Sequence, residues 1–260
     1  MPGSSGSEHA PLGPVAEQLE ALAAGGEERS ATVPLRRAAT LTAILGAVFG
    51  VLTLLALWLH STIPGARAED RQLIDYYEAG DNRLPVLVGL YIMPFAGIAF
   101  IWFMVALRGW ITAVAHRVDV LLSNVQLVSG IVFLTLFFAA GASSGVMAAS
   151  VEFSDGVIDP EVARMFPAFG STLFIVFAAR MAAMFVITTT SIGRGSGALP
   201  KWFVWAGYLV GLFLLLSATL QPLLFLVFPI WTLVLSALLL LRARQLPKEI
   251  TVAEFRAERP

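Results

Sequence analysis

Long apolar stretches separated by short polar segments dominate the chain from residue 38 onward. A bilayer core is about 30 Å thick, so a spanning helix needs about 20 predominantly apolar residues. Residues 202–241 would extend about 60 Å as one helix, so they are predicted to form a hairpin that turns at Gln221-Pro222. The pattern predicts six spans, at residues 38–59, 86–107, 121–149, 168–190, 202–220 and 222–241.

The segments between the spans carry helix signals of their own. Residues 66–79 contain no helix breaker, and Gly80 is a suitable stop. Asp159-Pro160-Glu161 has the pattern of a helix start, with an N-cap followed by proline. That helix is expected to be short because Pro167 follows. Pro94 and Pro229 are expected to kink or open the second and sixth spans.

Both ends of the chain are polar. Residues 1–37 are rich in Gly, Ser, Pro and Ala and are predicted to be a disordered tail. No apolar core follows a basic start within the first 30 residues, so this segment does not have the pattern of a cleavable signal peptide. The expected organisation is therefore a tail at 1–37, a six-helix membrane domain at 38–242 and a second tail at 243–260.

The distribution of basic residues predicts the orientation. With six spans, twelve Arg and Lys residues fall on one side of the membrane and four on the other. Because basic residues are enriched in cytoplasmic segments, both termini are predicted to be cytoplasmic. The opposite loops carry the acidic residues, from Glu69 to Glu161.

The composition supports this interpretation and excludes several classes of protein. The chain has 260 residues, of which 57% are hydrophobic and 13% charged, against about 25% charged in a typical soluble domain. Its mean hydropathy is +0.79. A net charge of -1 does not suit a nucleic-acid partner. There is no cysteine, which excludes disulfides and thiolate metal sites. The fold class is predicted to be an all-α, polytopic six-helix membrane bundle.

Residues that carry chemistry are sparse. The three histidines are His9 in the tail, His60 at the outer end of the first span and His116 in an inner loop, so no two are expected to share a metal or haem. The spans contain no Asp or Glu. Ser143 and Ser144 are poor nucleophile candidates because no histidine, lysine or carboxylate is predicted at their depth. No metal or cofactor is expected.

Arg180 is the most informative residue. It lies about 12 residues into the fourth span, and ionisable residues in a membrane core are costly and often functional. Its structural alternative is an arginine satisfied by backbone carbonyls and hydroxyls. As a binding residue it would act on an anionic or carbonyl group, with Tyr91, Ser143 and Ser144 as polar companions at depth.

Three Gly-x-x-x-Gly pairs mark helix packing. Small residues four apart let helix backbones approach closely in lipid. The expected role of these pairs is packing within the bundle, with a homo-oligomer face as the alternative. The pairs are Gly46 and Gly50, Gly141 and Gly145, and Gly207 and Gly211.

Five passages between about residues 38 and 245 carry a resemblance to known proteins. They are Asp81-Asn82-Arg83, Tyr91-Ile-Met-Pro94-Phe-Ala-Gly97, Phe177 to Met184 around Arg180, Leu199-Pro200-Lys201-Trp202 and Phe228-Pro229-Ile230-Trp231. Together they resemble an uncharacterised family of six-span membrane proteins from high-GC bacteria. The resemblance implies the six-helix architecture and a bacterial source, and it supplies no activity.

Two functional hypotheses follow. The first is a non-enzymatic protein of a bacterial inner membrane, acting as a solute or lipid conduit or as an accessory subunit of a membrane complex. The second is a membrane enzyme or quinone-linked subunit that holds an anionic or carbonyl group at Arg180. The expected partners are the bilayer itself, an anionic lipid or small solute, and another membrane protein or a second copy of the chain.

Overall fold

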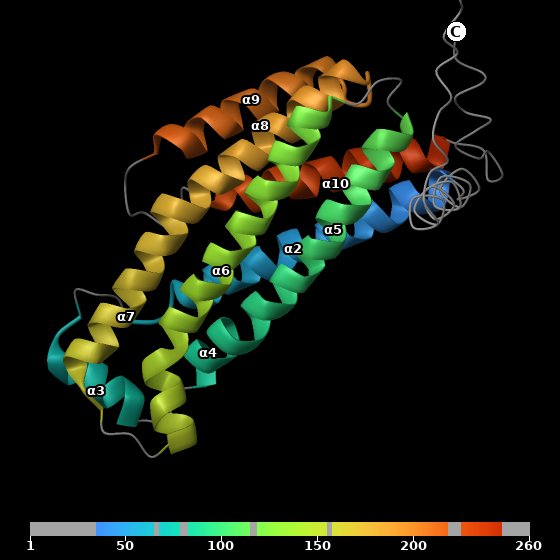
Figure 1. Cartoon of the computed structure of the whole chain (residues 1–260). Coiled ribbons are helices and arrows are strands. Elements are labelled where there is room, and N and C mark those ends of the chain that lie inside the picture. The colour runs from blue at the N-terminus through green and yellow to red at the C-terminus, as the bar shows by residue number, and fades with distance from the viewer. Residues whose placement is uncertain are drawn as a thin grey trace, which may run out of the picture.

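The computed structural model describes residues 35–64, 68–78, 83–114, 119–154, 158–217 and 225–245. Every regular element within these ranges is helical (Figure 1). Residues 1–34 and 246–260, which hold most of the two predicted tails, lie outside the described residues, as do His116 and the predicted turn at Gln221-Pro222.

The helices follow the predicted spans but run further. Two long rods each contain a π-helical segment: α4, η1 and α5 are continuous, and so are α7, η2 and α8. The elements are α2 (Leu35–His60), α3 (Asp70–Glu78), α4 (Arg83–Val86), η1 (Leu87–Ile92), α5 (Met93–Val114), α6 (Val120–Ser154), α7 (Pro160–Thr172), η2 (Leu173–Ala178), α8 (Ala179–Gly195), α9 (Lys201–Leu216) and α10 (Val227–Gln245).

Five of these stretches are long and apolar enough to cross a bilayer. They are Arg36–His60, Leu84–Ile111, Val120–Phe153, Pro160–Gly195 and Val227–Gln245. The predicted fifth span, 202–220, corresponds to α9, a largely apolar helix of 16 residues, which gives a length of about 24 Å. The chain is therefore a helical, multi-pass membrane protein with five full-length candidate spans and one shorter apolar helix among the described residues.

The helices form a bundle in which α2 and α6 are central. Helix α2 packs along α5 and α10, α6 packs against α5, α7 and α8, and α9 lies along α8 (Figure 1). The start of α2 and the end of α10 lie at one end of the bundle, whereas α3 and the start of α7 lie at the other. We refer to the α3 end as the outer end, following the predicted orientation.

Phenylalanine side chains fill the centre of the bundle. The Phe49 and Phe100 rings have centroids 4.8 Å apart, and Phe133 lies 5.0 Å from Phe100 and 5.1 Å from Phe228. Tilted and edge-to-face pairs at such distances are the favoured aromatic geometry. Residues from α2, α5, α6 and α10 thus interlock in one layer, which fixes the position of these helices relative to one another.

The prolines behave differently from the predictions at two of three positions. Pro94 follows η1, where Met93 N–H donates to the carbonyl of Val88, five residues back. The helix is thus locally opened before Pro94, as expected, and the opening takes the form of a π-helical segment. Pro229 lies in the first turn of α10, where a missing N–H has little effect, and the predicted interior kink was wrong. Pro167 does not end its helix, because packing on α6 and α3 supports the chain through it.

The predicted segments between the spans are partly confirmed. Helix α3 occupies Asp70–Glu78, within the predicted 66–79. Asp159 is the N-cap of α7 and its side chain accepts hydrogen bonds from the N–H groups of Glu161, at 2.8 Å, and Val162, at 3.4 Å. Gly80 and Gly156 lie outside the described residues.

Candidate functional site in the outer half of the bundle

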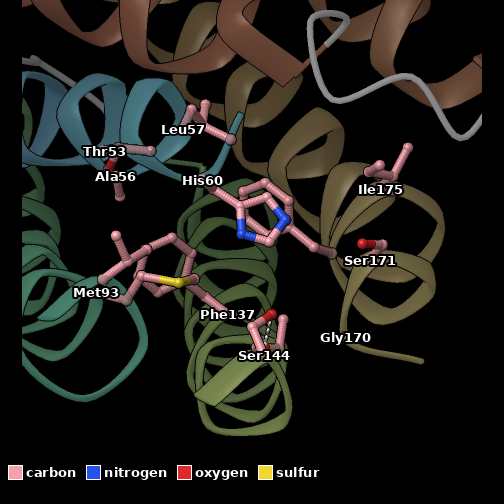
Figure 2. A pocket seen from close by; sticks show the side chains of 13 residues that line it. Thr53, Ala56, Leu57, His60, Met93, Phe137, Ser144, Gly170, Ser171 and Ile175 are labelled. Carbon is pink, nitrogen blue, oxygen red and sulfur yellow. Dashed lines mark hydrogen bonds between the residues drawn. The ribbon is translucent and has the colours of Figure 1, made fainter. Parts of the chain in front are cut away.

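A pocket lies where the last turns of α2 meet η1, α6 and the α7–η2 rod. Its empty space is about 480 Å³ when the open space at its mouth is included. Figure 2 shows the His60 imidazole extending from the end of α2 into the space between α6 and α7. The lining residues are Thr53, Ala56, Leu57, His60, Val88, Met93, Phe137, Ala140, Ser144, Gly170, Ser171, Phe174 and Ile175.

Both π-helical segments border this pocket. Val88 belongs to η1, and Phe174 and Ile175 belong to η2. In η2, Ala179 N–H donates to the Phe174 carbonyl, five residues back, so the helix is locally widened. π-Helical segments are rare and are frequently found at functional sites. Here the widened segments form part of the two pocket walls that face α6.

Four polar side chains lie within the otherwise apolar pocket. The hydroxyl of Thr53 is buried and has no hydrogen-bond partner among the described residues, although Thr53 is only 1% exposed. Within the same described ranges, neither the His60 imidazole nor the Ser171 hydroxyl has a hydrogen-bond partner. Ser144 donates to the Ala140 carbonyl at 2.9 Å and keeps its acceptor capacity. A buried polar group without a partner is costly, which indicates a group that a ligand or water satisfies.

The pocket continues outward toward α3. A second cavity of about 430 Å³, including its open mouth, shares His60, Ser144 and Ser171 with the first and adds Tyr77 and Pro167 to its walls. Burial raises the pKa of the Tyr77 phenol above its ordinary value, so the hydroxyl stays protonated and able to donate. The two cavities together form a cleft that leads from beneath α3 into the bundle.

Helix α3 is held over this cleft by contacts with α7. Arg164 donates to the Ala68 carbonyl at 2.8 Å and forms a salt bridge with Asp70 at 2.7 Å. Leu73 and Tyr77, on the inner face of α3, are 2% and 3% exposed. The side chains at the two ends of α3 thus fix it against the mouth of the cleft.

Gly170 sets the spacing between α6 and α7 beside the pocket. A Cβ atom at this position would lie 2.8 Å from the Ala140 carbonyl and 3.0 Å from the Ser144 Oγ. Only glycine therefore allows the two helices to approach this closely, and this approach brings Ser171 and Ser144 into one pocket.

The structure does not bring the predicted site residues together. Ser144 lines the pocket, and Ser143, the preceding residue of α6, is buried but is not part of the pocket wall. Tyr91 is 51% exposed on the surface of η1. Arg180 is half-buried and donates to the Val176 carbonyl in η2 of its own helix rather than to any residue of the pocket.

One premise of the sequence analysis was wrong. Ser144 was expected to have no histidine at its depth, but His60 lines the same pocket. Helix α2 ends at His60, whereas α3 and the start of α7 extend further toward the outer end (Figure 1). The Ser144 hydroxyl nevertheless donates to Ala140 and not to His60. No carboxylate is among the lining residues.

Two glycine pairs lie against side chains of neighbouring helices. A Cβ atom at Gly46, Gly50, Gly207 or Gly211 would come within 2.2 to 2.6 Å of such a side chain. The side chains met are those of Ser236 for Gly46, Leu233 for Gly50, Thr190 for Gly207 and Ile187 for Gly211. These positions place α2 against α10 and α9 against α8.

The third pair packs on a glycine that the sequence analysis did not identify. Gly141 and Gly145 face Gly89 in η1, where a Cβ atom would lie 2.6 Å from the Gly141 carbonyl. By contrast, a Cβ atom at Gly145 would meet Leu90 at 3.5 Å, which is ordinary contact. The position that requires glycine at this crossing is therefore Gly89.

Thr53, His60, Ser171 and Tyr77 are the other site residues that the sequence analysis missed. The signal for His60 was its place at the end of an apolar span, and for Ser171 its place beside Gly170. No group of three or more His, Cys, Asp or Glu side chains suited to a metal ion occurs among the described residues. No protein-family model, curated protein or solved structure matches the chain.

Proposed function

We propose that this protein is a non-enzymatic, six-span protein of a bacterial inner membrane that binds a small amphiphilic molecule in the His60 pocket. It would serve as a conduit for that molecule or as an accessory subunit of a membrane complex. The observation that carries the proposal is the buried Thr53 hydroxyl, which lines an apolar pocket and has no hydrogen-bond partner among the described residues.

The pocket suits an apolar body with one uncharged polar group. Met93, Phe137 and Phe174 offer apolar surface, and Thr53, His60 and Ser171 offer hydrogen bonds at one side of it. The lining contains no arginine, lysine or carboxylate that would select a charged group. A hydroxyl or carbonyl at the end of an acyl or isoprenoid chain is the ligand chemistry that this arrangement favours.

Helix parity supports six spans. The described helical part begins and ends at the same end of the bundle (Figure 1), which requires an even number of crossings. Five full-length candidate spans and the shorter α9 make six. Basic residues gather at this end, which supports cytoplasmic termini under the positive-inside rule. Those described there are Arg36, Arg37, Arg108, Arg194, Lys201, Arg242 and Arg244.

The second hypothesis, an enzyme or quinone-linked subunit built around Arg180, has less support. The Arg180 guanidinium donates to the Val176 carbonyl, and Arg180 lines neither cavity of the cleft. An arginine bonded to a carbonyl of a widened helical turn fits the structural alternative, in which backbone oxygens offset the cost of burial.

Photo-crosslinking tests the binding function. Membranes containing the protein are irradiated with a long-chain alcohol that carries a diazirine near its hydroxyl, and the labelled peptides are identified by mass spectrometry. Adducts are expected on η2 and the middle of α6. Thr53→Val preserves the side-chain shape and removes one hydrogen bond, so it should weaken labelling about fivefold.

Thr135→Val is the matched control, because the Thr135 hydroxyl is exposed on α6 and donates to the Ile131 carbonyl. This variant should label like the wild type. Adducts spread evenly over the lipid-facing surface, with equal yields in wild type and Thr53→Val, would show that the pocket does not bind the amphiphile.

A further inference from the structure

A third cavity lies at the opposite end of the bundle from the His60 pocket, where α8 turns into α9. It encloses about 1070 Å³, including its open mouth, and its walls include Arg194, Lys201, Trp205 and Tyr208. It shares no residue with the His60 pocket. We call it the α8–α9 cavity.

The charge of this cavity is uniformly positive. Arg194 and Lys201 are both exposed, and within the described ranges neither has an ion-pair partner. The lining contains no carboxylate. Two uncompensated cations facing one space form a site for an anion, and a phosphate group is an anion that Arg and Lys bind well.

The turn that separates the two cations is rigid. Gly197 has a φ of 67°, a conformation that favours glycine, and Leu199 N–H returns to the Gly193 carbonyl at 3.2 Å. Arg242 of α10 donates to the Ala198 carbonyl and so ties the turn to the bundle. The backbone positions of Arg194 and Lys201 are therefore set by the turn, and only their exposed side chains need to be ordered by a ligand.

The remaining walls are those of a membrane interface. Lys201, Trp205 and Tyr208 are spaced four and three residues apart, so they share one face of α9. Trp205 is 72% exposed, and Tyr208 is held by a 3.1 Å hydrogen bond between its hydroxyl and that of Ser191. Tryptophan and tyrosine gather at the level of lipid headgroups, so Trp205 and Tyr208 are suited to lie at that level together with the two cations.

We propose that the α8–α9 cavity binds the phosphate headgroup of an anionic phospholipid from the adjoining leaflet. Arg194 and Lys201 bind the phosphate, and Trp205 with Val204 contacts the upper part of the acyl chains. Basic pockets between membrane helices at the cytoplasmic face are suited to anionic headgroups. The proposal is independent of the His60 pocket and of any ligand bound there.

Native mass spectrometry on protein in mixed micelles tests this site. Phosphatidylglycerol and phosphatidylcholine with identical acyl chains are titrated, and the fraction of protein that retains each lipid is measured. The wild type should retain phosphatidylglycerol in preference to phosphatidylcholine. Arg194→Gln and Lys201→Gln should each weaken phosphatidylglycerol binding about fivefold, and both together about 25-fold. Raising the salt concentration should weaken it further.

Arg244→Gln is the matched control, because Arg244 is an exposed cation of the same end that does not line the cavity. It should bind phosphatidylglycerol like the wild type. Melting temperatures in phosphatidylcholine alone establish that the variants are folded, and Lys201→Arg should retain binding. Equal retention of the two lipids by the wild type, or equal losses in Arg244→Gln and Lys201→Gln, would overturn the proposal. If millimolar inorganic phosphate alone abolished phosphatidylglycerol binding, the assignment of the site to a lipid would be overturned.

Discussion

At the scale of single residues, the polar side chains inside the bundle fall into three groups. Most hydroxyls donate to a carbonyl of their own helix, as Thr42 does to Ala38 and Thr232 to Phe228. Gln126 instead donates across the bundle to Thr189, at 2.7 Å, and so joins α6 to α8. Thr53 does neither, and it is the residue of this kind that lines a pocket. The first group thus bonds within its own helix, the second links two helices, and Thr53 is left to bond a ligand or water in the pocket.

The hydrogen bond between Gln126 and Thr189 can be measured directly. Both side chains are buried, at 1% and 0% exposure. Interhelical hydrogen bonds in membranes contribute about 0.6 kcal/mol on average, so a double-mutant cycle with Gln126→Leu and Thr189→Val should give a coupling free energy of about that size. The measurement is unfolding in mixed micelles. A coupling of zero would mean that each side chain finds another partner when the first is removed.

At the scale of helices, close approach depends on particular glycines and on the two π-helical segments. Gly89 lies in η1 and contacts the α6 backbone at Gly141, and Gly170 lies near the end of α7 and contacts the same turns of α6 at Ala140 and Ser144. Gly170 lines the His60 pocket, and so does Val88, the neighbour of Gly89. The π-helical turns and the two glycines together set the shape of the site.

Gly89→Ala and Gly145→Ala should differ although the two glycines face each other. At Gly89 the new Cβ would lie 2.6 Å from a backbone oxygen, which cannot rotate away, whereas at Gly145 it would lie 3.5 Å from a leucine side chain. Overpacking costs about 1–3 kcal/mol, so Gly89→Ala should lower the melting temperature and Gly145→Ala should not. Equal melting temperatures for the two variants would contradict the close crossing of η1 and α6.

Helix α3 should loosen when its link to α7 is removed. Arg164 holds both Asp70 and the Ala68 carbonyl, but the two charged side chains are 31% and 68% exposed, so the salt bridge contributes at most about 1 kcal/mol to stability. Arg164→Gln should leave the melting temperature nearly unchanged and speed hydrogen exchange in residues 70–78. Unchanged exchange would mean that Leu73 and Tyr77 alone hold the helix.

The sequence was sufficient for the helices and not for the site. A run of apolar residues predicts a span because the bilayer imposes its own length scale, and five of the predicted spans correspond to helices long and apolar enough to cross a bilayer. Three predicted packing pairs lie against neighbouring helices, yet the partner Gly89 could not be identified from spacing alone. Arg180 is conspicuous in the sequence as a lone charge within a span, whereas the pocket depends on Thr53 and His60. Their proximity to Ser171 depends on how α2 packs beside the α7–η2–α8 rod, which the sequence pattern does not specify.

At the scale of the whole molecule, the two candidate sites lie at opposite ends. The His60 cleft opens beneath α3, in the half that carries the acidic α3 and the start of α7, and the α8–α9 cavity lies among the basic residues. A membrane protein with an apolar cleft in one leaflet and a cationic cavity in the other presents different chemistry to the two leaflets. This asymmetry follows the same charge distribution that predicts the orientation.

Cysteine labelling tests this orientation together with the number of spans. The chain contains no cysteine, so Glu78→Cys, Glu161→Cys and Gly195→Cys can each be made in the natural sequence. All three positions are exposed, and Gly195 has open space around its Cα. With six spans and cytoplasmic termini, an impermeant maleimide should label the first two in intact cells and the third only after the membrane is opened.

Gly195 follows four crossings in this arrangement and precedes α9, so a cysteine at Arg244, beyond α9 and α10, should behave like Gly195→Cys. Labelling of Arg244→Cys in intact cells, with Gly195→Cys protected, would mean that α9 does not cross and that the protein has five spans.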